Sequence, residues 1–113
     1  MSWRAQGMRT WLLQRMTAVY VAVYIIVAVV YLIPALPLAY SEWRDLFASP
    51  FINIATLFFI YALLAHAWVG MRDILIDYIH QLSLRFILMT LLGVLQFSLA
   101  IWVSMVMFSV VSL

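Results

Sequence analysis

The feature that most constrains this chain is a set of three long stretches without a charged side chain, at residues 16–41, 46–71 and 86–113. A helix needs about 20 mostly apolar residues to cross a hydrocarbon core of about 30 Å, and each stretch exceeds that length. We therefore predict membrane spans near residues 14–34, 50–72 and 86–110. The expected fold class is an all-α membrane protein, with residues 1–113 forming a single transmembrane domain of three helices.

Composition excludes the main soluble alternatives. Apolar residues make up 69% of the 113 residues and charged residues only 9%, whereas soluble domains are about 45–50% apolar. A small globule has too much surface to hide so many apolar side chains, so a self-contained soluble enzyme is excluded. Six arginines without a lysine do not form a basic face for nucleic acid. The absence of cysteine excludes disulfides and thiolate metal ligands.

The expected helix ends follow from proline, serine and charge. Pro34 cannot continue a helix, so the first span should stop at about Ile33. Ser49 and Pro50 suit the N-cap and first position of the second helix. Residues 72–85 hold the remaining charges and are expected to form a polar connection. Aromatic residues near the first loop are expected at the membrane interface: Tyr31, Tyr40 and Trp43.

The arginines predict the orientation. Five belong to the N-terminal segment and the second connection, and one belongs to the first connection. This positive-inside bias places the N-terminus in the cytoplasm and the C-terminus on the opposite side. Without a full transit peptide, a bacterial inner membrane is favoured. The five are Arg4, Arg9, Arg15, Arg72 and Arg85, against Arg44.

His66 is an ionisable side chain at membrane depth, which makes it a functional candidate. It precedes Arg72 by six residues and so lies about 9 Å inside the end of its span. Ala62 and Gly70 flank it on the same helix face, where a flat macrocycle could lie. The alternative is a histidine that hydrogen-bonds a neighbouring helix across ordinary close-packing positions. His80 lies in the polar connection, so a haem on His66 would need its second axial ligand from another chain.

Asp77 and Tyr78 form a second candidate group. Asp77 follows His66 by eleven residues, which is about 20° from the same helix face if the helix continues. A carboxylate beside a phenol at the membrane surface could direct a hydroxyl donor to the carbonyl of a lipophilic headgroup. The alternative is a solvated acid next to an interfacial tyrosine.

Other polar residues have both functional and structural interpretations. Arg15 could pair with an anionic group such as a haem propionate, or simply mark the membrane boundary. Gln96, midway along the third span, predicts a hydrogen bond between helices. Thr17, Tyr20 and Tyr24 recur at helical spacing and predict a slightly polar packing stripe.

The segment from His66 to Tyr78, in which ten residues separate the histidine from an Asp-Tyr pair, resembles the small hydrophobic anchor subunit of succinate dehydrogenase, respiratory complex II. Gly70 and the arginine in the run 14–18 agree with this resemblance. Three spans, the chain length and a cytoplasmic N-terminus agree as well, so that the resemblance covers essentially the whole chain.

The resemblance implies a concrete role. His66 would be one axial ligand of a b-type haem shared with a larger cytochrome b anchor subunit, with Arg15 near the haem propionates. Tyr78 would donate a hydrogen bond to ubiquinone, with Asp77 beside it. The flavin and the iron–sulfur clusters would belong to two soluble partners, a flavoprotein and an iron–sulfur subunit. The chain would anchor them to the membrane in aerobic electron transport and the tricarboxylic acid cycle, without a complete catalytic centre of its own.

Two other classes remain as alternatives from the residues alone. A holin-like pore former can have three spans in a chain of this size, but such proteins generally end in a basic cytoplasmic tail. A small transporter subunit would need a coupling group within the membrane, and none of the three spans contains an acid. Neither alternative gives His66, Asp77 and Tyr78 a role.

Overall fold

The fold is described here by a computed structural model, which covers residues 3–112, with side chains from residue 7 onward. All regular structure in this part is helical, as expected. The elements are α1 (Trp3–Leu32), the short 3-10 helix η1 (Ile33–Ala35), α2 (Tyr40–Ala48), α3 (Pro50–Tyr78) and α4 (Leu82–Val110).

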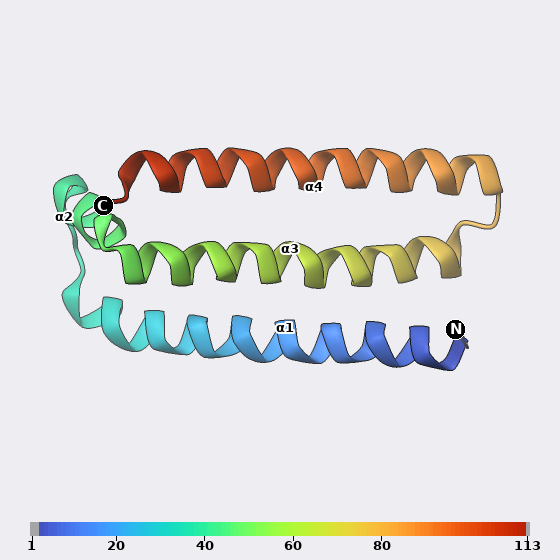
Figure 1. The fold of residues 1–113 in the computed structure, drawn as a ribbon, viewed down its shortest axis with the longest axis horizontal. Helices are drawn as coiled ribbons and strands as arrows, with labels where there is room; N and C mark the ends of the chain where they lie inside the picture. The colour runs from blue at the N-terminus through green and yellow to red at the C-terminus, as the bar shows by residue number, and fades with distance from the viewer. Residues whose placement is uncertain (1–2, 113) are drawn as a thin grey trace.

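The three long helices run antiparallel to their neighbours along a bundle 49 Å long, with α3 between α1 and α4 (Figure 1). α3 packs against both of the other long helices, and the short α2 packs across the ends of α3 and α4. We call the end with the start of α1 and the α3–α4 connection the arginine end, and the opposite end the α2 end. The arginine end carries Arg9, Arg72 and Arg85, and α2 itself carries Arg44.

Within residues 3–112, three helices are long and apolar enough to cross a membrane. Each has 29 or 30 residues, or about 44 Å at 1.5 Å per residue, which spans the hydrocarbon core and both headgroup layers. The fold class of three transmembrane helices is therefore confirmed.

The polar connection expected over residues 72–85 is helical for most of its length. α3 continues to Tyr78 and α4 already begins at Leu82, which leaves residues 79–81 as the link. Residues 72–78 contain neither proline nor glycine, and their charges can remain solvated in the headgroup layer, so nothing ends the helix there. α1 similarly begins well before residue 14.

The other expected helix ends are confirmed. α1 ends at Leu32, one turn of 3-10 helix follows with Pro34 in it, and Ser49 and Pro50 are the N-cap and first residue of α3. The Ser49 side chain makes no capping hydrogen bond. A buried side chain one turn later, Asn53, instead ties this corner together, donating 2.9 Å hydrogen bonds to the carbonyls of Phe47 and Met107.

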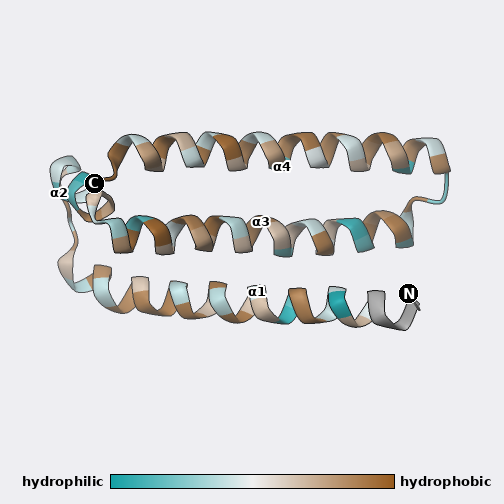
Figure 2. Cartoon of the chain, in the orientation of Figure 1, coloured by the Kyte–Doolittle hydropathy of each residue, from teal (hydrophilic) through white to brown (hydrophobic). Residues whose placement is uncertain are grey.

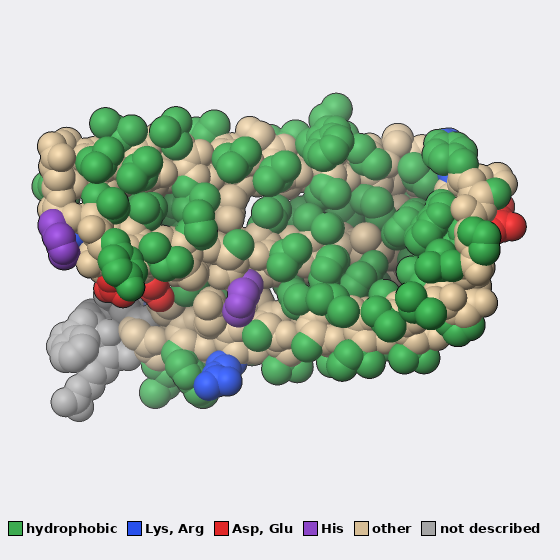
Figure 3. All heavy atoms as spheres, turned by 180° about the vertical axis from the view of Figure 1, so that it is seen from behind, with side chains coloured by type: hydrophobic (Ala, Val, Ile, Leu, Met, Phe, Trp, Pro, Cys, Tyr) green, Lys and Arg blue, Asp and Glu red, His purple; other side chains and the backbone are tan. Residues whose placement is uncertain are grey.

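The outside of the bundle is apolar. The buried hydrophobic side chains of the described residues are Leu57, Val69 and Met107, while many large apolar side chains are exposed along all three long helices. Hydrophobic residues recur along the whole length of each long helix (Figure 2). In the space-filling view, acidic side chains gather at the two ends and hydrophobic ones between them (Figure 3). Such a surface is suited to lipid or to the helices of other subunits.

Candidate functional site

The seam between α1 and α3 positions the histidine. Tyr20 donates a 2.8 Å hydrogen bond to the carbonyl of Ala55, and the hydroxyls of Tyr24 and Thr56 lie 2.8 Å apart. The ring of Tyr24 also stacks on Phe59, with centroids 4.2 Å apart. The predicted polar stripe on the first span is therefore confirmed as a packing seam, and its two tyrosine contacts hold α1 against the half of α3 nearer the α2 end.

His66 lies at the arginine-end side of this seam, half-buried near the middle of α3. Its Nδ1 atom is 3.2 Å from the hydroxyl oxygen of Thr17, which is itself buried. The Thr17 hydroxyl also donates to the carbonyl of Leu13 at 2.7 Å. Among the described residues, the other ring nitrogen, Nε2, makes no hydrogen bond. One ring nitrogen of His66 is thus tied to α1.

The strip of small residues beside His66 is partly covered. A Cβ atom on Gly70 would lie 4.0 Å from the side-chain nitrogen of Gln14 on α1. Gly70 therefore faces the Gln14 side chain of α1 at ordinary contact distance, with room for a methyl group. A macrocycle bound to His66 would have to lie elsewhere than between Gly70 and α1.

No group of three or more His, Asp or Glu side chains that could hold a metal ion occurs in the described part of the chain. A neutral imidazole nitrogen can ligate a haem iron. His66, whose Nδ1 contacts Thr17 and whose Nε2 makes no hydrogen bond within the described residues, would fit that role if a haem bound here.

Asp77 and Tyr78 are in the last turn of α3, at the arginine end. Because the helix continues, Asp77 lies about 20° from the direction of His66 and about 16 Å further along the axis. Tyr78 is 76% exposed and Asp77 is also exposed. No hydrogen bond joins the two side chains within the described structure, as expected for adjacent positions on a helix. His80 is exposed in the link that follows.

Arg85 has a role that the sequence did not reveal. From the first turn of α4 its guanidinium reaches back to the end of α3, donating from Nε to the carbonyl of Ile79 at 3.0 Å and from Nη2 to that of Ile76 at 3.3 Å. These carbonyls lack helical partners, and a cation there also interacts favourably with the helix dipole. Arg85 thus holds the link directly beside Tyr78. A basic residue shortly after a helix end is the signal that could have indicated it.

Arg15 is exposed, and its guanidinium carbon lies 5.5 Å from the ring centroid of Trp11. It precedes Thr17 by two residues, which is about 200° around α1, so the structure does not bring Arg15 onto the face that meets His66. Arg72 pairs with its neighbour Asp73 at 3.3 Å.

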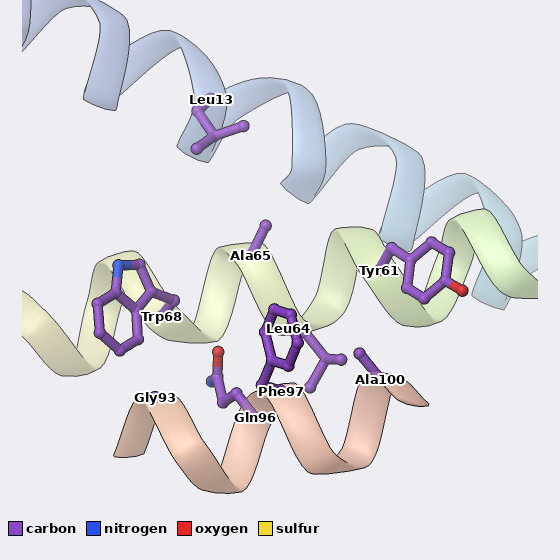
Figure 4. Close-up of a pocket in the computed structure, with 9 residues that line it drawn as sticks. All are labelled: Leu13, Tyr61, Leu64, Ala65, Trp68, Gly93, Gln96, Phe97 and Ala100. Atoms are coloured by element: carbon purple, nitrogen blue, oxygen red, sulfur yellow. The ribbon is translucent and has the colours of Figure 1, made fainter. Parts of the chain in front are cut away.

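An apolar groove of about 410 Å³ runs between the long helices (Figure 4). Its lining includes Trp68 and Leu64 of α3, Gly93 and Gln96 of α4, and Leu13 of α1. The hydrogen bond expected from Gln96 to a neighbouring helix is absent among the described residues, and its amide lies in the groove wall instead.

Comparison with known proteins agrees with this arrangement. The family described as succinate dehydrogenase/fumarate reductase transmembrane subunit matches residues 1–110. A succinate dehydrogenase hydrophobic membrane anchor subunit from Coxiella burnetii (strain RSA 493 / Nine Mile phase I) is 35% identical over 97 residues, covering 86% of this chain and 84% of the relative. The match leaves no need for the pore-former and transporter alternatives. The chain belongs to the family of transmembrane anchor subunits of succinate dehydrogenase and fumarate reductase.

Proposed function

We propose that this chain is the small anchor subunit of a succinate:quinone oxidoreductase and supplies His66 as one axial ligand of a b-type haem shared with a larger cytochrome b subunit. The observation that carries the proposal is a single half-buried histidine in the middle of a transmembrane helix, with one ring nitrogen bonded to Thr17 and the other unbonded. When bound, the haem supplies a one-electron carrier within the membrane. His66 would hold it from the α3 side, and α1 would keep the imidazole in place.

The second part of the proposal concerns the quinone. Tyr78 would donate a hydrogen bond from its hydroxyl to one carbonyl of ubiquinone, with Asp77 next to it. Support comes from the position of Tyr78, exposed at the end of a membrane helix where a lipophilic headgroup would arrive, and from the two hydrogen bonds of Arg85, which hold the adjacent link. A donor held there polarises the carbonyl and is available as that oxygen gains negative charge.

Further elements of the proposal concern the surroundings. Arg15 would pair with a haem propionate, since a guanidinium forms paired hydrogen bonds with carboxylates. The arginine end would face the cytoplasm of a bacterium, in its inner membrane, and would dock an iron–sulfur subunit and a flavoprotein that oxidise succinate. The distribution of arginines between the two ends supports this orientation.

The haem proposal is tested on the complex purified in mild detergent with its partner subunits, by comparing oxidised and dithionite-reduced absorption spectra. We expect a low-spin b-type haem that His66→Leu abolishes or converts to high spin. The matched control is His80→Leu, since His80 is the chain's other histidine and lies in the exposed link. An unchanged low-spin spectrum in the His66 variant would exclude His66 as the iron ligand.

The quinone proposal is tested with Tyr78→Phe. Loss of one hydrogen bond to the reacting carbonyl should lower succinate-dependent quinone reduction about tenfold or more, while reduction of a soluble dye by the flavoprotein stays unchanged. Tyr31→Phe, at an exposed tyrosine close to the α2 end, is the control. Equal loss of both activities in Tyr78→Phe would show that the hydroxyl supports assembly and has no specific part in quinone reduction.

A further inference from the structure

The hydrogen bonds of Thr17 determine where its own hydroxyl proton points and which ring nitrogen of His66 carries a proton. A threonine hydroxyl has one proton to donate. Its oxygen is 2.7 Å from the carbonyl oxygen of Leu13, and two oxygens this close need the proton between them. A second carbonyl of the same helix, that of Gln14, lies at 3.1 Å. The hydroxyl proton of Thr17 is therefore directed to its own helix.

It follows that the Thr17 hydroxyl oxygen can only accept a hydrogen bond from its third neighbour. The partner there is Nδ1 of His66, at 3.2 Å, so Nδ1 must carry a proton and donate it. In the neutral imidazole the other nitrogen, Nε2, then has a free lone pair. Thr17 is only 8% exposed, so water does not compete readily for this contact.

We propose that Thr17 is a positioning residue that selects the Nδ1-protonated form of His66, directs Nε2 toward the iron and strengthens it as a ligand. The inference rests on the proposed haem ligation by His66. A hydrogen bond donated to an acceptor by the ring nitrogen that does not bind the metal fixes the tautomer and ring orientation of a ligating histidine and raises its basicity. A more basic imidazole favours the ferric over the ferrous iron, because the extra electron density is more stabilising for the higher charge.

The hydrogen bond between Thr17 and His66 joins two different helices. α1 holds Thr17 and α3 holds His66, so the ligand strength depends on the packing of the two helices. Two seam contacts nearer the α2 end, Tyr20 with Ala55 and Tyr24 with Thr56, maintain that packing without touching the histidine. They provide a means to separate loosening of the seam from loss of the bond to His66.

The test compares Thr17→Val, which keeps the shape and removes the hydroxyl, with Thr17→Ser, which keeps the hydroxyl. Thr56→Val is the matched control, because it removes a hydroxyl from the same seam away from His66. Each variant is purified as the assembled complex. The readouts are the haem midpoint potential and the electron paramagnetic resonance spectrum of the ferric low-spin haem. If Thr17→Val does not assemble, Thr17→Ala replaces it, since alanine removes the hydroxyl and adds no bulk.

We expect Thr17→Val to lower the affinity of His66 for ferric iron about tenfold relative to its affinity for ferrous iron. Tenfold is the lower end of the effect of removing a hydrogen-bond partner from a ligating histidine. That corresponds to a midpoint potential about 59 mV higher for one electron, with altered g values. Thr17→Ser and Thr56→Val should both remain at the wild-type potential.

The outcomes separate the two proposals. A low-spin spectrum that persists in His66→Leu overturns the haem ligation itself, and the inference with it. Loss of that spectrum in His66→Leu together with a wild-type potential and g values in Thr17→Val overturns the role of Thr17 alone. An equal shift in Thr56→Val would attribute the effect to general loosening of the seam and would also refute it.

Discussion

Replacement of Asn53 by leucine, a side chain of similar volume, should loosen the α2 end of the bundle. Asn53 is 1% exposed, and both protons of its amide are used, one for the carbonyl of Phe47 at the end of α2 and one for that of Met107 near the end of α4. One side chain thus joins three helices. The backbone bond from Ser112 to Ala48 closes the same corner.

The cost of Asn53→Leu is calculated from what each carbonyl loses. The carbonyl of Met107 still accepts the backbone N–H of Val111 at 3.1 Å, so losing the amide there costs only the net value of one hydrogen bond, about 1 kcal/mol. The carbonyl of Phe47 lies in the last turn of a nine-residue helix and is left without this donor, which costs about 2 kcal/mol. The expected destabilisation is therefore about 3 kcal/mol.

The assay is unfolding of the full chain in detergent micelles titrated with dodecyl sulfate, followed by tryptophan fluorescence. Hydrogen exchange should quicken most in residues 43–53 and 107–112. Ser98→Ala is the control, because the exposed Ser98 bonds only to its own helix, and it should change stability by less than about 0.5 kcal/mol. If Asn53→Leu is no more destabilising than Ser98→Ala, the assignment of Asn53 as the bond that closes this corner is wrong.

Three further changes test other parts of the bundle. Arg85→Met should quicken hydrogen exchange at residues 76–82, because two carbonyls at the end of α3 lose a charged donor; unchanged exchange would contradict that cap. Tyr24→Phe should cost about 0.6 kcal/mol in the same unfolding assay, the typical value of a hydrogen bond between membrane helices. A double variant with Thr56→Val should cost no more than Thr56→Val alone, because the Tyr24 hydroxyl bonds to Thr56, whereas the Thr56 hydroxyl also bonds to the carbonyl of Ile52. Gly70→Ala should leave stability unchanged or raised by up to about 1 kcal/mol, since the new methyl group would meet only the Gln14 side chain at 4.0 Å; a large loss of stability would show that the seam is closer than described.

Much of the fold could be predicted from the pattern of charge and proline. Each charge-free stretch has more residues than a helix needs to cross a membrane. In lipid, a single segment can pair its own backbone N–H and C=O groups only as a helix, which is why the number and type of the long elements were predicted correctly. Proline removes a backbone donor and clashes with the preceding turn, so the ends near Leu32 and Ser49 were also correct. α3 continues past residue 72 because charge marks the edge of the hydrocarbon and does not by itself end a helix.

For the site, the sequence was sufficient to single out His66, Asp77 and Tyr78 as unusual, because ionisable and hydrogen-bonding groups at membrane depth or at its surface are costly unless they have a role. It also required a second chain for any haem, simply because one histidine lies at depth. Both conclusions depend only on residue types and on their spacing along a single helix. The regular geometry of an α-helix converts that spacing into a depth and a direction.

The partner of each polar group was decided only when the helices packed. Thr17 and His66 are 49 residues apart and Asn53 and Met107 are 54 apart, and no spacing rule relates positions on different helices. The rotation of α1 against α3 determines that Thr17 faces Nδ1 while Arg15 points away, and the approach of α4 determines that Arg85 caps α3. Hydrogen bonds need atoms within about 3 Å at suitable angles, so a small rotation of one helix would give each of these residues a different partner. Residue type along the chain therefore sets which groups need partners, and the packing of the three helices decides which partners they meet.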